Sequence, residues 1–338
     1  MRNLGQINRL LGGALLVQIV LVAATSYARD DKKFVPPTKL FPEFVPDKVT
    51  KVAVAGFNGT GADKKPTTVN LVKNGTAWGI EGADGYPVDA TKIDTLLKNV
   101  EKLKAGAPVV EKESFFKKLE VADDEYQRKV TLTHDGKEIS FFLGSSPGFK
   151  RVHLRKAGEK AVVSVEGLAV WDVGSRAQDW VERAYYKIPE NDVWAVNLKN
   201  SKGALRIEKA PGGEWAVIGA KASEAPKKSA IDDLVRKVAT VNLEEPVGKA
   251  EKPEYGLQNP TTVVELLTGT STIPGTMPTT THGETLLIGA KNGSAYYVKS
   301  TKSEYVVTAP AWAIDPLTTK VAGDLFEQPK AADPKKPK

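Results

Sequence analysis

The stretch Trp78–Leu103, WGIEGADGYPVDATKIDTLLKNVEKL, is followed by a modified copy at Trp215–Val241, WAVIGAKASEAPKKSAIDDLVRKVATV. In each copy a tryptophan precedes five apolar residues spaced i, i+3, i+4, i+7 and i+10, which is the spacing of one helix face. Each apolar position of the second copy lies at the same offset from its counterpart in the first. These positions are Ile93, Leu96, Leu97, Val100 and Leu103, and then Ile231, Leu234, Val235, Val238 and Val241. Such internal repetition predicts that the fold itself is duplicated.

Strand and turn patterns occur in the same order around both helices. Hairpin turns are predicted at Asn74-Gly75 and at Gly212-Gly213, because both dipeptides tolerate the positive φ values of tight turns. We therefore predict an α+β fold of two tandem homologous repeats, residues 49–190 and 191–326, each a mostly antiparallel β-sheet with one long packed helix. The short connection at 181–192 favours close packing of the repeats.

Local signals refine the first repeat. Asp89 is the predicted N-cap of its long helix. The stretch 107–116, APVVEKESFF, is predicted to form a strand and a short helix. Residues 168–183 are predicted to form a further helix because their apolar residues follow a helical spacing. The apolar residues are Val170, Val173, Ala177, Trp180 and Val181.

Both ends of the chain differ in composition from the repeats. Residues 1–28 have a short basic start and an uncharged apolar run over 10–28, which predicts a membrane anchor or a signal peptide cleaved near Ala28. Both alternatives stay open, and both place the rest of the chain outside the cytoplasm, in a periplasmic setting. The proline-rich residues 29–48 are predicted to be an extended spacer. The Lys/Pro tail 327–338 is predicted to be disordered.

The composition excludes several functional classes. The chain has 338 residues and a formal net charge of +7, with much of the excess at the two ends. Nucleic-acid binding would need basic residues concentrated in the folded body, so we do not expect it. The chain contains no cysteine, which excludes disulfides, thiolate metal sites and a cysteine nucleophile.

Two patterns resemble ligand sites but do not fit them. The glycine-rich segment 56–65, GFNGTGADKK, is followed by Pro66 and a predicted strand, whereas a phosphate-binding loop leads into a helix N-terminus. His134, His153 and His282 are far apart in sequence and lack metal-ligand spacing. His134 and His282 fall in the same inter-strand connection of the two copies, so we predict that both are loop residues.

Repeated acidic and aromatic residues are the remaining candidates for chemistry. Glu125, which follows Asp123 and Asp124, matches Glu254, and two such carboxylates could serve glycan hydrolysis. Because the acids recur with the repeat, we favour a capping or turn-stabilising role. Trp78 and Trp215 form one equivalent tryptophan pair, and Trp171 and Trp312 form another. We predict that both pairs pack in the core, with carbohydrate stacking as the alternative.

The order of these motifs resembles the bacterial family named domain of unknown function 4340. The resemblance comprises the apolar N-terminus, the tryptophan strand before YPVDATKIDTLLKNVEKL, EYGLQNP at 254–260 before TVVELL, and LLIG at 286–289. It covers about residues 45–326, and the first copy departs from it at Glu125-Tyr126-Gln127. The resemblance implies extracytoplasmic, membrane-anchored accessory proteins that occur beside ABC-type permeases and gliding-motility-like subunits. It carries no catalytic residues.

Three functional hypotheses remain at this point. We favour a non-enzymatic extracytoplasmic accessory or scaffold protein with protein partners in an ABC-type or gliding-motility-like membrane complex. It would have no catalytic, cofactor-binding or metal-binding residues, and its membrane contact would run through residues 10–28. The first alternative is an envelope-glycan binder or hydrolase that gathers some of Glu125, Glu254, Trp171 and Trp312 in a pocket. The second is a structural subunit of a surface assembly that docks through 29–48 and the loop 269–283.

Overall fold

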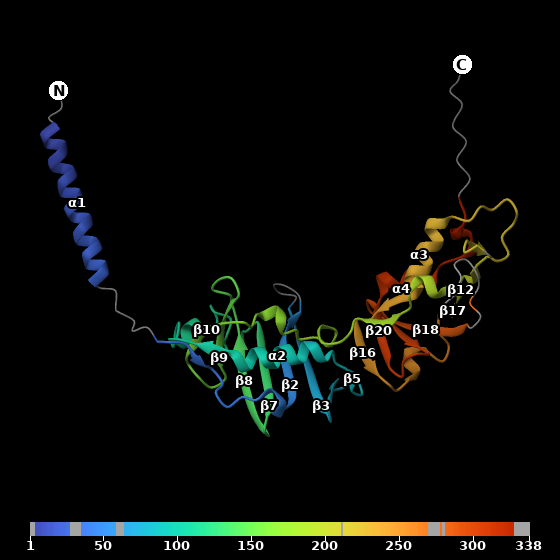
Figure 1. Ribbon diagram of the computed structural model, residues 1–338, viewed down its shortest axis with the longest axis horizontal. Coiled ribbons are helices and arrows are strands. Elements are labelled where there is room, and N and C mark those ends of the chain that lie inside the picture. The colour runs from blue at the N-terminus through green and yellow to red at the C-terminus, as the bar shows by residue number, and fades with distance from the viewer. Residues whose placement is uncertain are drawn as a thin grey trace, which may run out of the picture.

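The computed structural model describes residues 4–27, 35–58, 64–210, 212–269, 278 and 281–327, and the side chains of 4–10, 23–27 and 58 are not part of this description. Two eight-stranded sheets, in which every strand pairing is antiparallel, dominate the described chain. Figure 1 shows them as two neighbouring halves, with the N-terminal helix apart from both. The predicted α+β fold with two sheet-based halves is confirmed.

The two sheets share one strand order over seven strands. The first runs β10-β9-β8-β7-β2-β3-β4-β5, and the second runs β20-β19-β18-β17-β12-β13-β14 with β16 added beside β20. The first-sheet strands are β2 Val49–Asn58, β3 Lys65–Asn74, β4 Ala77–Ile80, β5 Tyr86–Pro87, β7 Arg128–His134, β8 Lys137–Leu143, β9 Arg151–Lys156 and β10 Val162–Glu166. The second-sheet strands are β12 Val193–Asn200, β13 Gly203–Lys209, β14 Trp215–Val217, β16 Glu245–Gly248, β17 Thr262–Thr268, β18 His282–Asn292, β19 Ala295–Ser300 and β20 Val306–Pro310.

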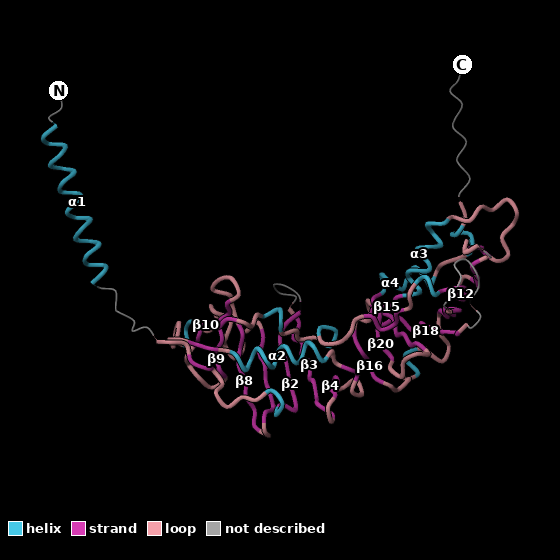
Figure 2. The backbone as a smooth tube through the Cα atoms, viewed as in Figure 1, coloured by secondary structure: helices cyan, strands magenta, loops and turns pink. Residues whose placement is uncertain are grey.

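One long helix belongs to each sheet, α2 (Ala90–Lys102) in the first half and α3 (Lys228–Ala239) in the second. All ten apolar positions of the repeated stretch are buried, as predicted. Asp89 caps α2, and its Oδ1 accepts a hydrogen bond of 2.9 Å from the Thr91 amide. Lys227 occupies the N-cap position of α3, and its side chain makes no capping hydrogen bond. Figure 2 shows α2 lying across the strands of the first sheet.

Each half also has a small two-stranded sheet. In the first half β1 (Thr38–Lys39) pairs with β6 (Lys104–Ala105), and in the second β11 (Ala184–Lys187) pairs with β15 (Thr240–Asn242). The 3-10 turns η1 (Pro46–Lys48) and η6 (Glu190–Asp192) then lead into β2 and β12. Phe41 and Phe44 are buried in the core. Residues 38–48, assigned from sequence to the spacer, therefore pack against the first sheet.

The two halves share one hydrophobic core and contact each other directly, as the short connection predicts. The rings of Tyr86 and Tyr305 meet edge to face at 4.9 Å. The Tyr305 hydroxyl donates to the Gly85 carbonyl at 3.3 Å, and the Lys249 amide donates to Asp84 Oδ2 at 2.7 Å. The repeats thus pack as one continuous unit.

The predicted helix over 168–183 is wrong. This stretch contains two 3-10 turns, η4 (Val170–Asp172) and η5 (Ala177–Asp179). Each turn is closed by its own aspartate, since Asp172 accepts from the Ala169 amide at 2.9 Å and Asp179 from the Arg176 amide at 3.1 Å. These bonds compete with a continuous helix. The second half differs, with α4 (Ala311–Thr318) before η8 (Ala322–Leu325).

The predicted strand in 107–116 is also absent as a strand, because Val110 forms only an isolated bridge with Val162. The predicted short helix is present as the turn η3 (Glu113–Phe115), and η7 (Pro253–Tyr255) is a further turn in the second half.

The N-terminal helix α1 spans Leu4–Tyr27. Within the described residues, no helix combines the length and the apolar character needed to cross a membrane. Several predictions fall partly or wholly outside the described residues: the ends of the segment 1–28, the spacer before residue 35, most of the loop 269–283, and the tail after Glu327.

Candidate functional site

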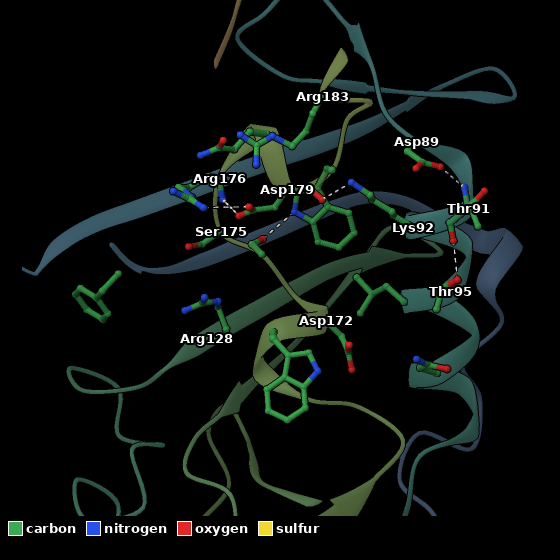
Figure 3. A pocket seen from close by; sticks show the side chains of 17 residues that line it. Asp89, Thr91, Lys92, Thr95, Arg128, Asp172, Ser175, Arg176, Asp179 and Arg183 are labelled. Atoms are coloured by element: carbon green, nitrogen blue, oxygen red, sulfur yellow. Dashed lines mark hydrogen bonds and ion pairs between the residues drawn. The ribbon is translucent and has the colours of Figure 1, made fainter. Parts of the chain in front are cut away.

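A cavity of about 710 Å³ opens in the first half. Three parts of the chain form its walls: one face of α2, the ends of β2 and β7, and the segment 167–183, which we call the connector because it joins β10 to β11. Figure 3 shows Thr91 and Thr95 on the α2 wall, with Arg176 and Asp179 beside each other on the connector.

The connector is tied to the first turn of α2. The Asp89 amide donates to the Trp180 carbonyl at 2.8 Å, and Lys92 Nζ donates to the carbonyls of Asp179 at 3.0 Å and Val181 at 3.2 Å. Gly174 is required here because a Cβ at that position would lie 2.2 Å from Asp179 Cβ. These bonds hold the connector wall against α2.

The second half repeats this tie. The Lys227 amide donates to the Leu325 carbonyl at 2.7 Å, and Asp324 accepts from the Val321 amide at 3.1 Å. Leu325 therefore stands where the first half has Trp180, and Asp324 where it has Asp179. We call the segment that follows the last strand of each sheet the closing segment; in the first half it is the connector. The duplication extends to the hydrogen bonds that anchor each closing segment.

Arg128 fixes the floor of the cavity. It lies opposite Gly56 in the β2–β7 register, and its Nε donates to the Val173 carbonyl at 2.8 Å while its Nη1 donates to the Gln127 carbonyl at 2.7 Å. A Cβ at Gly56 would lie 2.8 Å from Arg128 Nη1 and 2.9 Å from Ser175 Oγ. Glycine at position 56 therefore lets the arginine cross the strand to reach the connector.

In the second half, the side chain that holds the closing segment comes from β12, the counterpart of β2, and not from β17, the counterpart of β7. Asn200 and Thr262 are the paired residues there, at the places of Gly56 and Arg128. Asn200 Nδ2 donates to the carbonyls of Leu317 at 2.9 Å and Lys320 at 2.8 Å. The Thr262 hydroxyl is buried and has no hydrogen-bond partner among the described residues. In each half, one long polar side chain therefore binds the carbonyls of the closing segment.

The cavity carries more positive charge than its ion pairs neutralise. Lys92 and Arg128 bond to backbone carbonyls, and, among the residues that the structure describes, Arg176 alone of the four cationic lining residues pairs with a carboxylate, Asp179 at 3.3 Å. The fourth, Arg183, is exposed. Burial lowers the pKa of the Arg128 guanidinium, but an arginine stays protonated in proteins. With Asp89, Asp172 and Asp179 also in the lining, the net formal charge of the cavity walls is +1.

The tryptophan pairs behave differently from each other. Trp78 is buried and Trp215 is half-buried, in agreement with the packing prediction. Trp171 and Trp312 are 76% and 78% exposed, so the packing prediction is wrong for this pair. Each lies in the first helical turn after the last strand of its sheet, and Trp171 lines the cavity.

The predicted loop positions of His134 and His282 are wrong as well, because they are terminal residues of β7 and β18. His134 Nε2 accepts from the Val45 amide at 3.1 Å, and its ring stacks on Phe44. His153 is buried in β9 with Nδ1 3.1 Å from Ser145 Oγ, and burial lowers its pKa. The three histidines are not brought together.

The acids considered for glycan hydrolysis are also apart. Glu125 and Glu254 are exposed and belong to different halves, and neither lines the cavity that contains Trp171. Asp123 pairs with Arg155 at 3.0 Å and Asp124 with Lys117 at 2.7 Å. Within the described part of the chain no group of three or more His, Cys, Asp or Glu residues could hold a metal ion. Part of the glycine-rich segment 56–65 lies outside that description.

Comparison with known proteins places the chain in a family. Residues 78–260, more than half of the sequence, match the family model described as Domain of unknown function (DUF4340). The chain belongs to the DUF4340 family. The DUF4340 match begins at Trp78 and includes both long helices, the connector and Arg128. No curated protein and no solved structure matches the chain.

Sequence reasoning identified Trp171 but missed Arg128 and Gln178 as cavity residues. A signal for them was present. The glycine at 56 interrupts a β-rich strand, and glycine in a strand often marks the close approach of another group. The register that places Arg128 opposite Gly56 became visible only in the structure.

Proposed function

We propose that this DUF4340 chain is a non-enzymatic, extracytoplasmic accessory protein that is held at the membrane by α1 and contacts an ABC-type or gliding-motility-like membrane complex. The observation that carries the proposal is the distribution of apolar side chains on α1. Eight of them are 56–64% exposed: Leu11, Leu15, Leu16, Val17, Ile19, Val20, Leu21 and Val22.

These eight side chains surround the helix. Successive helical residues are rotated by about 100°, so the eight positions spread around the axis and do not gather on one stripe. A surface helix of a soluble domain has one apolar face and one polar face. A helix with apolar side chains all round gains stability by entering an apolar medium, which supports a role as a membrane tether.

The folded body supports a binding role. Because the halves share one core, Trp171 and Trp312 are presented on a continuous body. Exposed tryptophans are unusual on a solvated surface and are enriched at the energetic centres of protein interfaces. Two such residues at matching places in both halves suit a protein that docks on a partner. The partner class comes from the resemblance found in the sequence.

Membrane extraction of the full-length chain tests the tether. We expect the protein to resist alkaline carbonate washing and to keep Met1. Leu16→Arg combined with Val20→Arg should release it, because a charged side chain in the hydrocarbon region of a membrane is costly. Gln18→Leu on the same helix is the matched control and should stay bound. A soluble mature protein that starts at Arg29 would refute the tether.

Site-specific photo-crosslinking in intact cells tests the partner. Crosslinkers are placed at Trp171 and at Trp312, and adducts are identified by mass spectrometry. We expect a permease or ATPase subunit in the adducts from at least one position. Adducts that contain only soluble envelope proteins would contradict the proposed membrane complex while leaving the tether intact.

A further inference from the structure

We propose that the cavity of the first half binds a sugar that carries a carboxylate. The proposal goes beyond the accessory role and shares Trp171 with it, but it concerns the walls of this cavity and not the location of the protein or its membrane tether. Four features support it: an unpartnered amide, cationic groups without carboxylate partners, an exposed indole and the absence of a phosphate-type cradle.

The first feature is Gln178. Its side chain is 9% exposed and lines the cavity, and the described part of the chain supplies no hydrogen bond to its amide. The amide oxygen and nitrogen are not among the fully buried polar atoms without a partner, so both can be reached from the cavity. An amide both donates and accepts, which is how proteins meet hydroxyl groups. A polyhydroxylated ligand would therefore find both a donor and an acceptor on this wall of the cavity.

The second feature is charge. Lys92 and Arg128 line the cavity and bond to backbone carbonyls, so neither positive charge is paired with a carboxylate among the described residues. Two of the three aspartates in the walls are occupied with backbone amides at turns, Asp172 at Ala169 and Asp179 at Arg176. The third, Asp89, caps α2. With these aspartates counted, the four cationic and three acidic lining residues leave a net formal charge of +1, and we place the ligand carboxylate beside Lys92 and Arg128.

The third feature is Trp171, whose indole is 76% exposed although it borders the cavity. The face of an aromatic ring is negative, and the C–H hydrogens on one side of a sugar ring are weakly positive. A sugar stacked there would cover apolar surface while its hydroxyls reach the polar wall. The cavity volume of about 710 Å³ lies in the usual range for small-ligand sites.

The same geometry disfavours a phosphate. Bidentate binding by arginine is the preferred mode for phosphate, but Arg128 already uses Nε and Nη1 for carbonyls. The N-terminus of α2 borders the cavity, yet the Asp89 carboxylate occupies it. The remaining N–H groups of Arg128 can donate to a carboxylate, which needs fewer hydrogen-bond donors than a phosphate does.

An extended peptide is also disfavoured. Peptides that add to a sheet need an exposed edge strand. The strands at this cavity, β2 and β7, are central in their sheet and are paired on both sides. The walls offer side-chain amide, hydroxyl and guanidinium groups, which are the groups that bind sugar hydroxyls and carboxylates.

The test is a titration of the full-length chain in detergent micelles with glucuronic acid and with a glucuronate-containing disaccharide. Binding is followed by tryptophan fluorescence and by calorimetry. We expect saturable binding that weakens with added salt and exceeds the binding of glucose by about tenfold or more. Inorganic phosphate and an acidic hexapeptide are parallel probes.

Variants locate the site. Trp171→Ala should weaken glucuronate binding about tenfold or more, and Gln178→Met should weaken it while keeping the side-chain volume. Trp312→Ala, at the matching exposed place in the second half, should leave binding unchanged. Circular dichroism confirms that each variant is folded before it is titrated.

Three results would overturn the proposal. They are the absence of saturable binding by either acidic sugar to the folded full-length chain, equal loss of binding in the Trp171 and Trp312 variants, and tighter binding of phosphate or the peptide than of the sugars. None of these results would affect the membrane tether, which is tested by extraction.

Discussion

The Gly56–Arg128 pair allows a quantitative test of how the connector is held. Arg128 makes two charge-assisted hydrogen bonds to carbonyls, at 2.8 and 2.7 Å, and it is half-buried. A hydrogen bond to a charged group contributes about 1.5–3 kcal/mol when buried, so two half-buried ones place the cost of Arg128→Ala at about 2–3 kcal/mol. Asn200→Ala loses two neutral hydrogen bonds at the matching place and an exposed one that Asn200 Oδ1 accepts from the Lys202 amide, and it should cost about 1–2 kcal/mol.

A double-mutant cycle isolates the contact. Gly56→Ala places a Cβ against Arg128 and Ser175, so it should displace the arginine and cost part of the same free energy. In the Arg128→Ala background the main obstacle is gone. The double variant should then be more stable than the sum of the single costs predicts, by about 1 kcal/mol. Urea unfolding of the full-length chain, followed by fluorescence, measures the four free energies. Strict additivity, or a cost of Arg128→Ala below that of Asn200→Ala, would refute this account of the connector.

Three further predictions concern separate places. Burial raises the pKa of Glu245, beside the contact between the halves, to about 7. The stability that protonated Glu245 contributes is therefore complete below about pH 4.5 and is lost as the pH rises towards 7. Unfolding midpoints measured over a pH series should fall across this range, and Glu245→Gln should remove that fall. Lys227→Asp should stabilise α3 by up to about 1 kcal/mol because it supplies the missing N-cap, whereas Asp89→Ala should destabilise α2 by a similar amount. Thermal unfolding measures both variants, and a shift of the melting temperature in the same direction for both would contradict this. Trp171→Ala and Trp312→Ala should each change the unfolding free energy by less than about 0.5 kcal/mol, because the indoles are mostly exposed, and a larger loss would show that they pack after all.

The long helices were predictable from sequence because their apolar spacing is strong and occurs twice. The positions from Ile93 to Leu103 and from Ile231 to Val241 are all buried, and hydrophobic periodicity over ten or more residues is the most reliable local signal. The hairpins at Asn74-Gly75 and Gly212-Gly213 were equally clear because their turns need positive φ, which the structure shows at Gly75, Gly212 and Gly213.

The connector was not predictable in the same way. Its apolar residues fall at helical intervals, but Asp172 and Asp179 bond to nearby backbone amides and Gly174 passes close to Asp179. Local side-chain bonds of this kind override periodicity. The cavity depends on these bonds and on a cross-strand register, so its residues could not be grouped from sequence spacing alone.

The exchange between Gly56–Arg128 and Asn200–Thr262 also bears on how two copies of one sequence can diverge. From the first arrangement, changing only Arg128 to threonine would leave the Val173 carbonyl without its donor, and changing only Gly56 to asparagine would drive a side chain into the arginine. Each single step is therefore worse than either end point. A recombination event that exchanged one strand of this pair between the two copies would therefore combine residues that do not fit each other. We expect each half to keep its own pair of residues at this place.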